Sequence, residues 1–475
     1  FVKTKLLAPG ESQKIKLSFP ATVMASYDDS GATGHRHCFV LEKGDYKFFL
    51  GTDSHDTRQI MLKKSDSWTL YETFVVEKVQ QCCAPTEEFE RLKPGTVLSD
   101  GSYSAYYEKV PTNVVNLEER IKSNLPKEIP FTGDVGLRFK HLKHNPSKVD
   151  AFIGQLSKEE LATLVRGEGM CSDKVTQGIA AAYGGLSPAL HEYGIPVAGC
   201  SDGPSGIRMD NGKTASLMPI GTCLACTWNE ALVTELYEFE GKELAENKID
   251  ALLGPGMNIH RHPLNGRNFE YYSEDPLLTG TMACAALTGM RKYGAHGTIK
   301  HFATNNQETN RQNVDAIVSE RALREIYLSA FKKAVTKGGA ISVMTTYSPL
   351  NGHWTASNYD LVNMILHKEW GFSGLVMTDW WAKMNDCVDG GIPTAHNTAS
   401  MVRAHNDVYM CVPNDGAASN ANGDNIPVYL ESDKLTLAEL QQCAKSVINF
   451  LLKANVSKRS LAPLFQAQLC EVQHS

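Results

Sequence analysis

Residues 374–381 read GLVMTDWW, in which an uninterrupted apolar run, Leu375 to Met377, leads to the carboxylate of Asp379 and two tryptophans. Continuous apolar runs are typical of buried strands in parallel sheets. A carboxylate at the end of such a strand is costly to remove from water unless it has partners or a function. In a (β/α) barrel this position opens onto the active-site face. An acid beside aromatic rings suits a sugar, although Asp379 could instead simply cap the next helix.

Short apolar runs alternate with helical stretches from about residue 136 onward. We expect helices from Asn229 to Asn247 and around residues 323–334. Such alternation predicts an α/β fold with a parallel sheet, closed as a TIM-like (β/α) barrel. Only seven candidate strands can be found, so one barrel strand is missing or irregular. The candidates are residues 195–201, 217–223, 251–259, 297–302, 340–348, 374–379 and 407–412.

The chain has 475 residues, more than a single hydrophobic core normally holds, so we expect several segments. Residues 1–62 alternate at the strand period, at 15–19 and 46–50, and predict part of an all-β sandwich. Residues 63–135 contain several prolines and predict a linker or extension. The barrel is expected over 136–415. Residues 416–475 predict a polar loop and a C-terminal helix that starts at the capping box of Thr436 and Glu439.

Composition excludes some classes of function. A net charge of −6 gives no electrostatic reason to expect nucleic acid, and no apolar run approaches the roughly 20 residues that span a bilayer. The 12 scattered cysteines are not a disulfide scaffold, so we expect reduced thiols and a cytoplasmic location, with secretion as the alternative. Cys223 and Cys226 lack a second matching pair, and the 260–262 His-Arg-His stretch lacks a further ligand. We therefore expect no metal and no cofactor.

Polar residues follow five of the predicted strands at the same end of the sheet. Each has an ordinary interpretation: Asp202 could organise a turn, Arg267 and Glu270 could form a local ion pair, Lys300 could be solvated, and His301 could be a core histidine. Their joint placement is what indicates a site. The residues are Asp202, Arg208, Arg267, Glu270, Lys300, His301, Arg311, Met344, Tyr347, Asp379 and Trp380.

The segments SDGPSGIR (201–208), GRNFEYYSEDP (266–276), KHFATNNQETNR (300–311), YSPLNG (347–352) and VMTDWW (376–381) resemble, in order and spacing, those of glycoside hydrolase family 3. The resemblance to these β-glucosidases and their relatives covers roughly residues 145–415. The stretches LLAPGESQKIKLSF (6–19) and EKGDYKFFLG (42–51) also look like the family's fibronectin-type-III-like domain. Because that segment precedes the barrel here, the chain resembles a circularly permuted subgroup.

The resemblance implies a retaining, exo-acting β-glucosidase that hydrolyses terminal non-reducing β-D-glucosyl units, with Asp379 as the nucleophile. Asp202 would accept hydrogen bonds from the remote hydroxyls of that sugar. Tyr347 would lie near the nucleophile and the ring oxygen, and Met344 and Trp380 would line the pocket. We expect nearby cations to keep the pKa of Asp379 low. The residues implied to bind the other hydroxyls or to orient Asp379 are Arg208, Arg267, Lys300, His301 and Arg311.

One departure concerns the acid/base, which β-glucosidases of the family take from an α/β sandwich not recognisable here. The branch that carries it on a KHFPGHG-like loop is disfavoured, because this chain reads KHFATNN. We expect the acid/base glutamate to come from a second polypeptide or an amino-terminal portion, an expectation that the missing initiator Met favours. The expected substrate is a β-glucoside or oligosaccharide, with xylose as the next choice of sugar.

Two other hypotheses remain. The chain could be a non-catalytic sugar-binding or scaffold subunit of a glycosidase complex, which a missing catalytic carboxyl would fit. Another barrel enzyme, such as an aldolase or a phosphate-binding barrel, would need a Schiff-base lysine or a late glycine-rich anion loop. Lys300 lies in a motif with a different pattern, and the late loops lack those glycines.

Overall fold

The structure is a computed structural model that describes residues 1–62 and 65–459. Its internal contacts divide the chain into a smaller unit, Phe1–Asn113 with Val318–Glu325, and a larger unit, Val114–Ile317 with the chain from Ile326 onward. The domain boundaries expected from the sequence remain predictions. The last part of the expected 416–475 segment, residues 460–475, lies outside the described residues.

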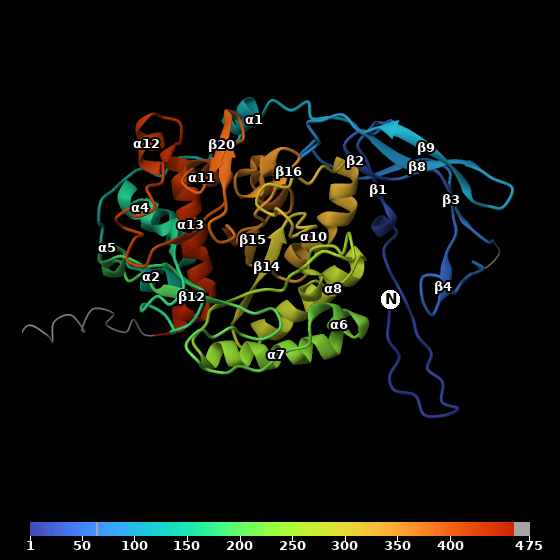
Figure 1. The fold of residues 1–475 in the computed structure, drawn as a ribbon, viewed down its shortest axis with the longest axis horizontal. Coiled ribbons are helices and arrows are strands. Elements are labelled where there is room, and N and C mark those ends of the chain that lie inside the picture. The colour runs from blue at the N-terminus through green and yellow to red at the C-terminus, as the bar shows by residue number, and fades with distance from the viewer. Residues whose placement is uncertain (63–64, 460–475) are drawn as a thin grey trace, which may run out of the picture. The chain divides into compact units, whose positions relative to one another are not determined.

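The larger unit is built on an eight-stranded mixed sheet in the order β18-β15-β14-β13-β12-β11-β10-β21. Its pairings are parallel except for those of β11, which is antiparallel to β10 and β12. A parallel bridge between Met377 and Val408 joins the two ends and curls the sheet into a TIM-like barrel (Figure 1). The strands are β10 (Arg166–Glu168), β11 (Ala181–Gly184), β12 (Val197–Asp202), β13 (Ala251–Leu253), β14 (His296–Phe302), β15 (Ser342–Thr345), β18 (Leu375–Met377) and β21 (Tyr409–Val412).

Six of the seven candidate strands overlap a barrel strand, which confirms them. The expected strand at 217–223 is wrong, because α6 (Gly221–Cys226) begins there and Leu217 is 90% exposed. A short apolar run cannot be told from a helix start by periodicity alone. The prediction missed β10 and β11. These are short and lack the β-branched residues that indicate strands, and alanine provides two of the four buried residues of β11.

Helices cover the outside of the barrel. The predicted helix at 229–247 is confirmed as α7 (Glu230–Glu246), with the Asn229 side chain accepting from the Leu232 amide. The expected helix around 323–334 is helical in three pieces, α9 (Glu320–Ala322), the π-helical η4 (Leu323–Tyr327) and α10 (Ser329–Thr336). The others are α1 (Leu117–Ser123), α2 (Phe139–His144), α3 (Val149–Ile153), α4 (Lys158–Leu164), α5 (Pro188–Glu192), α8 (Pro276–Arg291), the π-helical η6 (Asp360–Glu369), α11 (Thr398–Arg403), α12 (Ile426–Glu431) and α13 (Leu437–Lys453).

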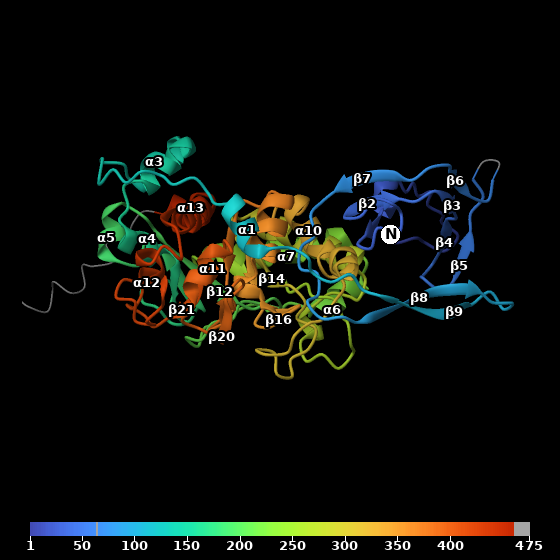
Figure 2. The ribbon, with the colours of Figure 1, turned by 90° about the horizontal axis from the view of Figure 1, so that it is seen from above.

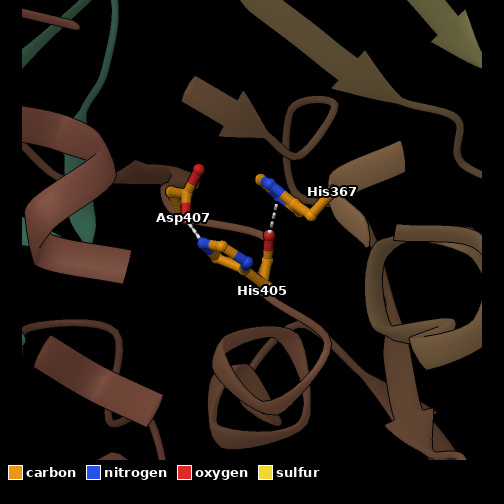
Figure 3. A group of neighbouring side chains, drawn as sticks. All are labelled: His367, His405 and Asp407. Atoms are coloured by element: carbon orange, nitrogen blue, oxygen red, sulfur yellow. Dashed lines mark hydrogen bonds and ion pairs between the residues drawn. The ribbon is translucent and has the colours of Figure 1, made fainter. Parts of the chain in front are cut away.

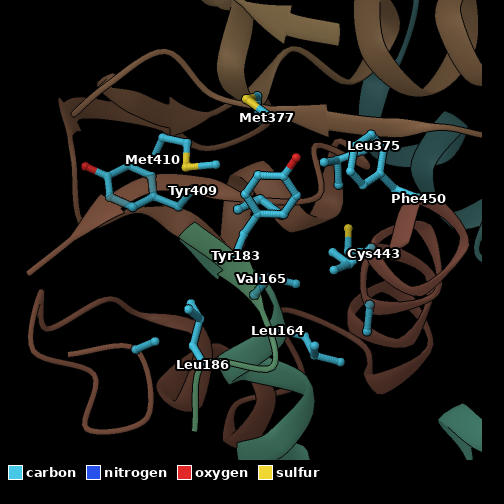
Figure 4. Close-up of a cluster of buried hydrophobic side chains, with 14 of the residues drawn as sticks. Leu164, Val165, Tyr183, Leu186, Leu375, Met377, Tyr409, Met410, Cys443 and Phe450 are labelled. Atoms are coloured by element: carbon cyan, nitrogen blue, oxygen red, sulfur yellow. The ribbon is translucent and has the colours of Figure 1, made fainter. Parts of the chain in front are cut away.

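Helix α13 begins at the predicted capping box: Thr436 accepts from the Glu439 amide, and the Glu439 carboxylate accepts from the Thr436 amide. It packs against α3 and α4 (Figures 1 and 2). Its Phe450 ring lies 5.7 Å from that of Tyr183 on β11. Figure 4 shows these rings in one buried cluster with residues from β18 and β21. This helix therefore seals the barrel where its irregular strands lie.

Short strands make up the smaller unit and the loops. In the smaller unit β1 (Ser26–Asp28), β2 (Cys38–Leu41) and β7 (Phe74–Lys78) form one sheet; β3 (Gly44–Tyr46) pairs with β6 (Trp68–Leu70), β4 (Phe49–Gly51) with β5 (Thr57–Gln59), and β8 (Glu90–Val97) with β9 (Tyr103–Lys109). In the larger unit β16 (Pro349–Leu350) pairs with β17 (His353–Trp354), and β19 (Met384–Asp386) with β20 (Gly390–Thr394).

The alternation at 15–19 does not form a strand, so that part of the β prediction is wrong. Leu17 and Phe19 are 50% and 57% exposed, and no strand among the described residues pairs with this stretch. An alternating pattern forms a strand only where a neighbour accepts its backbone hydrogen bonds. The alternation at 46–50 divides instead between the ends of β3 and β4.

Two features of the described part bear on the expected environment. Its cysteines are free thiols. Cys223 and Cys226 both lie in α6 and are exposed to solvent. Within residues 1–62 and 65–459, no helix combines the length and the apolar character that crossing a bilayer would require.

A buried ion pair ties β10 to the loop after β21. Arg166 donates from Nε and Nη2 to the two carboxylate oxygens of Asp424, at 2.6 and 3.1 Å, and from Nη1 to the Ala417 carbonyl at 2.9 Å. Both side chains are almost fully buried. Removing one partner of such a pair leaves an uncompensated buried charge.

Replacing Asp424 with alanine should lower the free energy of unfolding by about 3–5 kcal/mol, because Arg166 then stays buried without its carboxylate. Urea unfolding followed by near-ultraviolet circular dichroism measures this change. The matched control is Asp134→Ala, which breaks the solvent-exposed pair with Arg138. Equal urea midpoints of unfolding for the two variants would contradict the stabilising role assigned to the buried pair.

Candidate active site

The ten residues predicted from the strand-end motifs all line one cavity of about 410 Å³ in the larger unit. They come from segments that are up to 178 residues apart in the chain, Asp202 to Trp380. Their individual roles remain predictions. The cavity is lined by Asp202, Arg208, Arg267, Lys300, His301, Arg311, Met344, Tyr347, Asp379 and Trp380, together with Met170, Gly178, Ala180, Asp210, Leu253 and Trp381.

The barrel brings these side chains together because they lie at, or just after, the carboxyl ends of parallel strands. Asp202 is the last residue of β12, Lys300 and His301 are near the end of β14, and Met344 is in β15. Asp379 follows β18 by two residues. Carboxyl ends of parallel strands open onto the same face of the barrel, where such barrels carry their sites.

A chain of opposite charges forms one wall of the cavity. The Lys300 ammonium lies 3.0 Å from Asp202 Oδ1 and 3.6 Å from Glu270 Oε2. The Arg267 guanidinium donates a hydrogen bond to the other Glu270 carboxylate oxygen. Burial opposes ionisation of Asp202, but Lys300 and the Gly203 amide outweigh it and lower the pKa of that carboxyl. Asp202 is therefore ionised near neutral pH and can accept hydrogen bonds.

His301 is fixed by a buried hydrogen-bonded relay. Asn305 donates to the Tyr271 hydroxyl at 2.8 Å, and that hydroxyl lies 3.0 Å from His301 Nδ1. Burial and the charges of Arg267 and Lys300 hold the pKa of His301 well below its usual range, so the ring is neutral. If Tyr271 donates to Nδ1, the ring proton lies on Nε2, which faces Asp379 Oδ2 at 3.7 Å.

Asp379 is 7% exposed, and its carboxyl accepts a hydrogen bond from the Trp380 amide at 2.8 Å. Our expectation that its pKa stays low is wrong in direction. Burial raises the pKa of Asp379, and Arg267, the Trp380 amide, Lys300 and the Tyr347 hydroxyl oppose the rise without cancelling it. The desolvation of the carboxylate was not visible in the sequence, whereas the cations were.

The outer part of the cavity holds the more exposed predicted residues. The Arg311 guanidinium lies 4.5 Å from the centre of the Tyr347 ring and donates to Glu308 at 2.8 Å. Arg208 is paired with Asp210 at 2.9 Å, with 61% of its side chain exposed. Arg208 therefore stands at the mouth of the cavity rather than beside Asp379.

Several residues that line the cavity were not predicted from the sequence. Trp381 and Met170 line the cavity from its exposed edge. The doubled tryptophan of TDWW was a signal for Trp381, but nothing in the pattern around residue 170 indicated Met170. Glu270 was recognised only as a nearby acid; it is 5% exposed and holds Arg267 and Lys300 in place.

The other carboxylates in and beside this cavity are all held by cations. Asp202 is paired with Lys300, Asp210 with Arg208, Glu270 with Arg267, and Glu308 with Arg311. A general acid needs a proton to give near neutral pH, which a cation beside the carboxylate disfavours. Among the described residues around the cavity, Asp379 is thus the carboxyl without a direct ion pair to lysine or arginine.

A second cluster, His367, His405 and Asp407, lies in the core of the larger unit (Figure 3). The two imidazole rings are stacked, 3.6 Å apart and 15° from parallel. Parallel rings direct their nitrogens side by side, not toward a shared point at metal–ligand distance. Both ring nitrogens of His367 also face carbonyl oxygens, at 2.9 and 3.0 Å. We interpret the cluster as a structural part of the core.

A family model, curated relatives and solved structures all point to the same protein family. Residues 145–450 match the model of the glycosyl hydrolase family 3 N terminal domain. A β-glucosidase from Ruminococcus albus is 49% identical over 462 residues, which are 97% of this chain and 47% of that protein. The crystal structure of a β-glucosidase from Paenibacillus barengoltzii superposes with a TM-score of 0.95 at 54% identity, covering 97% of this chain and 50% of the other.

A more distant structure, β-glucosidase 3B from Thermotoga neapolitana in complex with glucose, is 38% identical with a TM-score of 0.56. It covers 65% of this chain and 43% of the other. This chain thus spans about half the length of the relatives that it matches.

Lys300→Met should raise the pKa of Asp379 further, because it removes one of the cations that oppose the effect of burial. The carboxyl would then lose its proton only at a higher pH. Titration of ¹³C-labelled aspartate by NMR measures this, with Asp379→Asn identifying the signal. The control Lys292→Met removes a surface lysine paired with Glu238. A lower pKa of Asp379 in Lys300→Met than in the wild type would contradict the effect assigned to Lys300.

Proposed function

This chain belongs to glycosyl hydrolase family 3, and on that premise we propose that it carries the nucleophile and the sugar site of a retaining, exo-acting β-glucosidase. The observation that carries the proposal is the position of Asp379. It is a nearly buried carboxyl without a direct lysine or arginine partner, at the C-terminal face of the barrel, in a cavity otherwise lined by paired charges. The substrate would be a terminal, non-reducing β-D-glucosyl unit.

The proposed first step is attack by a carboxylate oxygen of Asp379 on the anomeric carbon. The bond from that carbon to the leaving-group oxygen breaks, and an acid protonates the departing oxygen. In the second step, the conjugate base takes a proton from water, the water oxygen bonds to the anomeric carbon, and Asp379 leaves as a carboxylate. Two inversions retain the configuration of the sugar.

The residues around Asp379 fit supporting roles in these steps. Asp202 and Lys300 offer an acceptor and a donor, 3.0 Å apart, that suit neighbouring hydroxyls of a sugar. The neutral His301 faces Asp379 and would orient it through Nε2. Charge-assisted hydrogen bonds are short and strong, so a few such contacts can hold one ring in position.

We propose that the acid/base glutamate comes from outside residues 1–475, either from another segment of a longer protein or from a partner chain. The support is chemical: the other carboxylates around the cavity are bound by cations. The relatives are also about twice as long as this chain. Retaining enzymes place the second carboxyl roughly 5–5.5 Å from the nucleophile, so the missing group must reach the cavity mouth.

We further propose that the smaller unit is the fibronectin-type-III-like domain of a circularly permuted relative, in which that domain precedes the barrel. Its short strands between Ser26 and Lys109 are consistent with such a β domain. A sugar-binding subunit without chemistry is the second candidate, favoured by the missing acid. The two candidates differ in one respect: in a sugar-binding subunit, Asp379 would not form a covalent bond with a glycoside.

The nucleophile can be tested in this chain alone with 2,4-dinitrophenyl 2-deoxy-2-fluoro-β-D-glucopyranoside. Dinitrophenolate leaves without a proton, so the first step needs no acid, and the fluorine slows the second step. We expect a mass increase of one fluoroglucosyl group on a peptide that contains Asp379, and none in Asp379→Asn. An unlabelled wild-type chain that still binds glucose would favour the sugar-binding subunit.

Asp202→Asn should weaken glucose binding by roughly tenfold or more, because a charged hydrogen-bond acceptor becomes a neutral one. Isothermal titration calorimetry with glucose measures it. Asp210→Asn is the matched control, since Asp210 lies in the same cavity but pairs with the exposed Arg208. Equal losses in both variants would count against a specific contact between Asp202 and the sugar.

A further inference from the structure

The position of Glu270 depends on a short turn of the backbone. Glu270 is the last residue of η3 (Asn268–Glu270), a single 3-10 turn. Its buried carboxylate pairs with Arg267 and Lys300. A turn this short keeps a fixed position only where neighbouring elements tie its backbone. The contacts that hold η3 therefore decide where the two cations stand in the cavity.

One hydroxyl group ties both ends of this turn to helix α6. Thr222 Oγ1 lies 2.8 Å from the Asn268 carbonyl oxygen and 3.0 Å from the carbonyl oxygen of Tyr271, the residue directly after Glu270. A threonine hydroxyl has one proton to donate, so the two acceptors share it in a three-centre hydrogen bond. Thr222 thus spans the segment that presents Glu270 to the cavity.

The start of α6 also lies against the backbone of the same turn. A Cβ atom at Gly221, directly before Thr222, would be 2.7 Å from the Glu270 carbonyl oxygen and 3.0 Å from that of Tyr271. Only glycine permits so close an approach of two backbone segments. The helix is therefore in direct contact with η3, and no side chain of Gly221 separates them.

We propose that Thr222 is a positioning residue for the sugar site: by holding η3, it fixes Glu270 and, through Glu270, Arg267 and Lys300. Thr222 is not among the described residues that line the cavity, so it acts on a bound sugar only through these contacts. The proposal rests on the proposed function, because a sugar is the ligand that the fixed charges are expected to bind. Binding groups need such support, since a displacement of about 1 Å weakens their contacts.

The test measures glucose affinity by isothermal titration calorimetry in Thr222→Val, which keeps the shape of the side chain but cannot donate a hydrogen bond. We expect glucose to bind roughly three- to tenfold more weakly, because η3 is released and Lys300 is no longer held beside Asp202. Thr222→Ser keeps the hydroxyl and should bind glucose within about twofold of the wild-type affinity.

Thr234→Val is the matched control. Thr234 is a half-buried threonine of α7, and its hydroxyl donates to the Glu230 carbonyl at 2.9 Å, away from η3. This variant should bind glucose as the wild type does. A loss in Thr234→Val or in Thr222→Ser equal to that in Thr222→Val would overturn the positioning role.

A double-mutant cycle separates positioning from a general loss of stability. In Glu270→Gln the charged pairing that Thr222 supports is already broken, so adding Thr222→Val should change the glucose affinity by less than about twofold. An equal loss in the wild-type and Glu270→Gln backgrounds, or no loss in Thr222→Val alone, would overturn the positioning role and leave the proposed function intact.

If Thr222→Val does not fold, Gly221→Ala displaces the same turn without removing the hydroxyl. It should weaken glucose binding by roughly threefold or more, and an unchanged affinity would overturn the positioning role. Failure of the wild-type chain to bind glucose would overturn the proposed function, and the role of Thr222 with it.

Discussion

The burial of the Asp379 carboxylate is the constraint on which the arrangement of the other charged groups in the cavity depends. Burial favours its protonated form, while Arg267 and Lys300 favour the anion. Lys300 is itself buried and Arg267 is partly buried, and both are paired with anions, Asp202 and Glu270. The result is a connected set of charges in which each member is satisfied by the next, as buried charges require.

The barrel and its site were largely predictable, because both depend on short-range patterns. Apolar runs followed by polar residues identified six strands and all ten predicted cavity residues. The predictions that failed concern features that depend on packing. The 217–223 run became the start of a helix, and β11 was missed because its alanines are buried by neighbours rather than by their own hydrophobicity. The pKa of Asp379 likewise depends on the volume of protein around it, which no motif encodes.

A closed barrel has a further consequence for chemistry. Strand ends can present several charged groups to one sugar, but those groups pair with one another, and a paired carboxylate is a poor proton donor. Placing the acid on a separate element avoids this conflict, since that carboxyl can stay away from Lys300 and Arg267 and keep its proton. The proposed division of labour between this chain and another segment is therefore supported by electrostatics as well as by the greater length of the relatives.

The central claim is that one monosaccharide sits in this cavity with its anomeric carbon facing Asp379. A crystal structure of the chain with glucose tests it most directly. The account predicts the anomeric carbon about 3–3.5 Å from a carboxylate oxygen of Asp379, with hydroxyls on Asp202 and Lys300. Glucose bound elsewhere, or bound with its anomeric carbon turned away from Asp379, would contradict it.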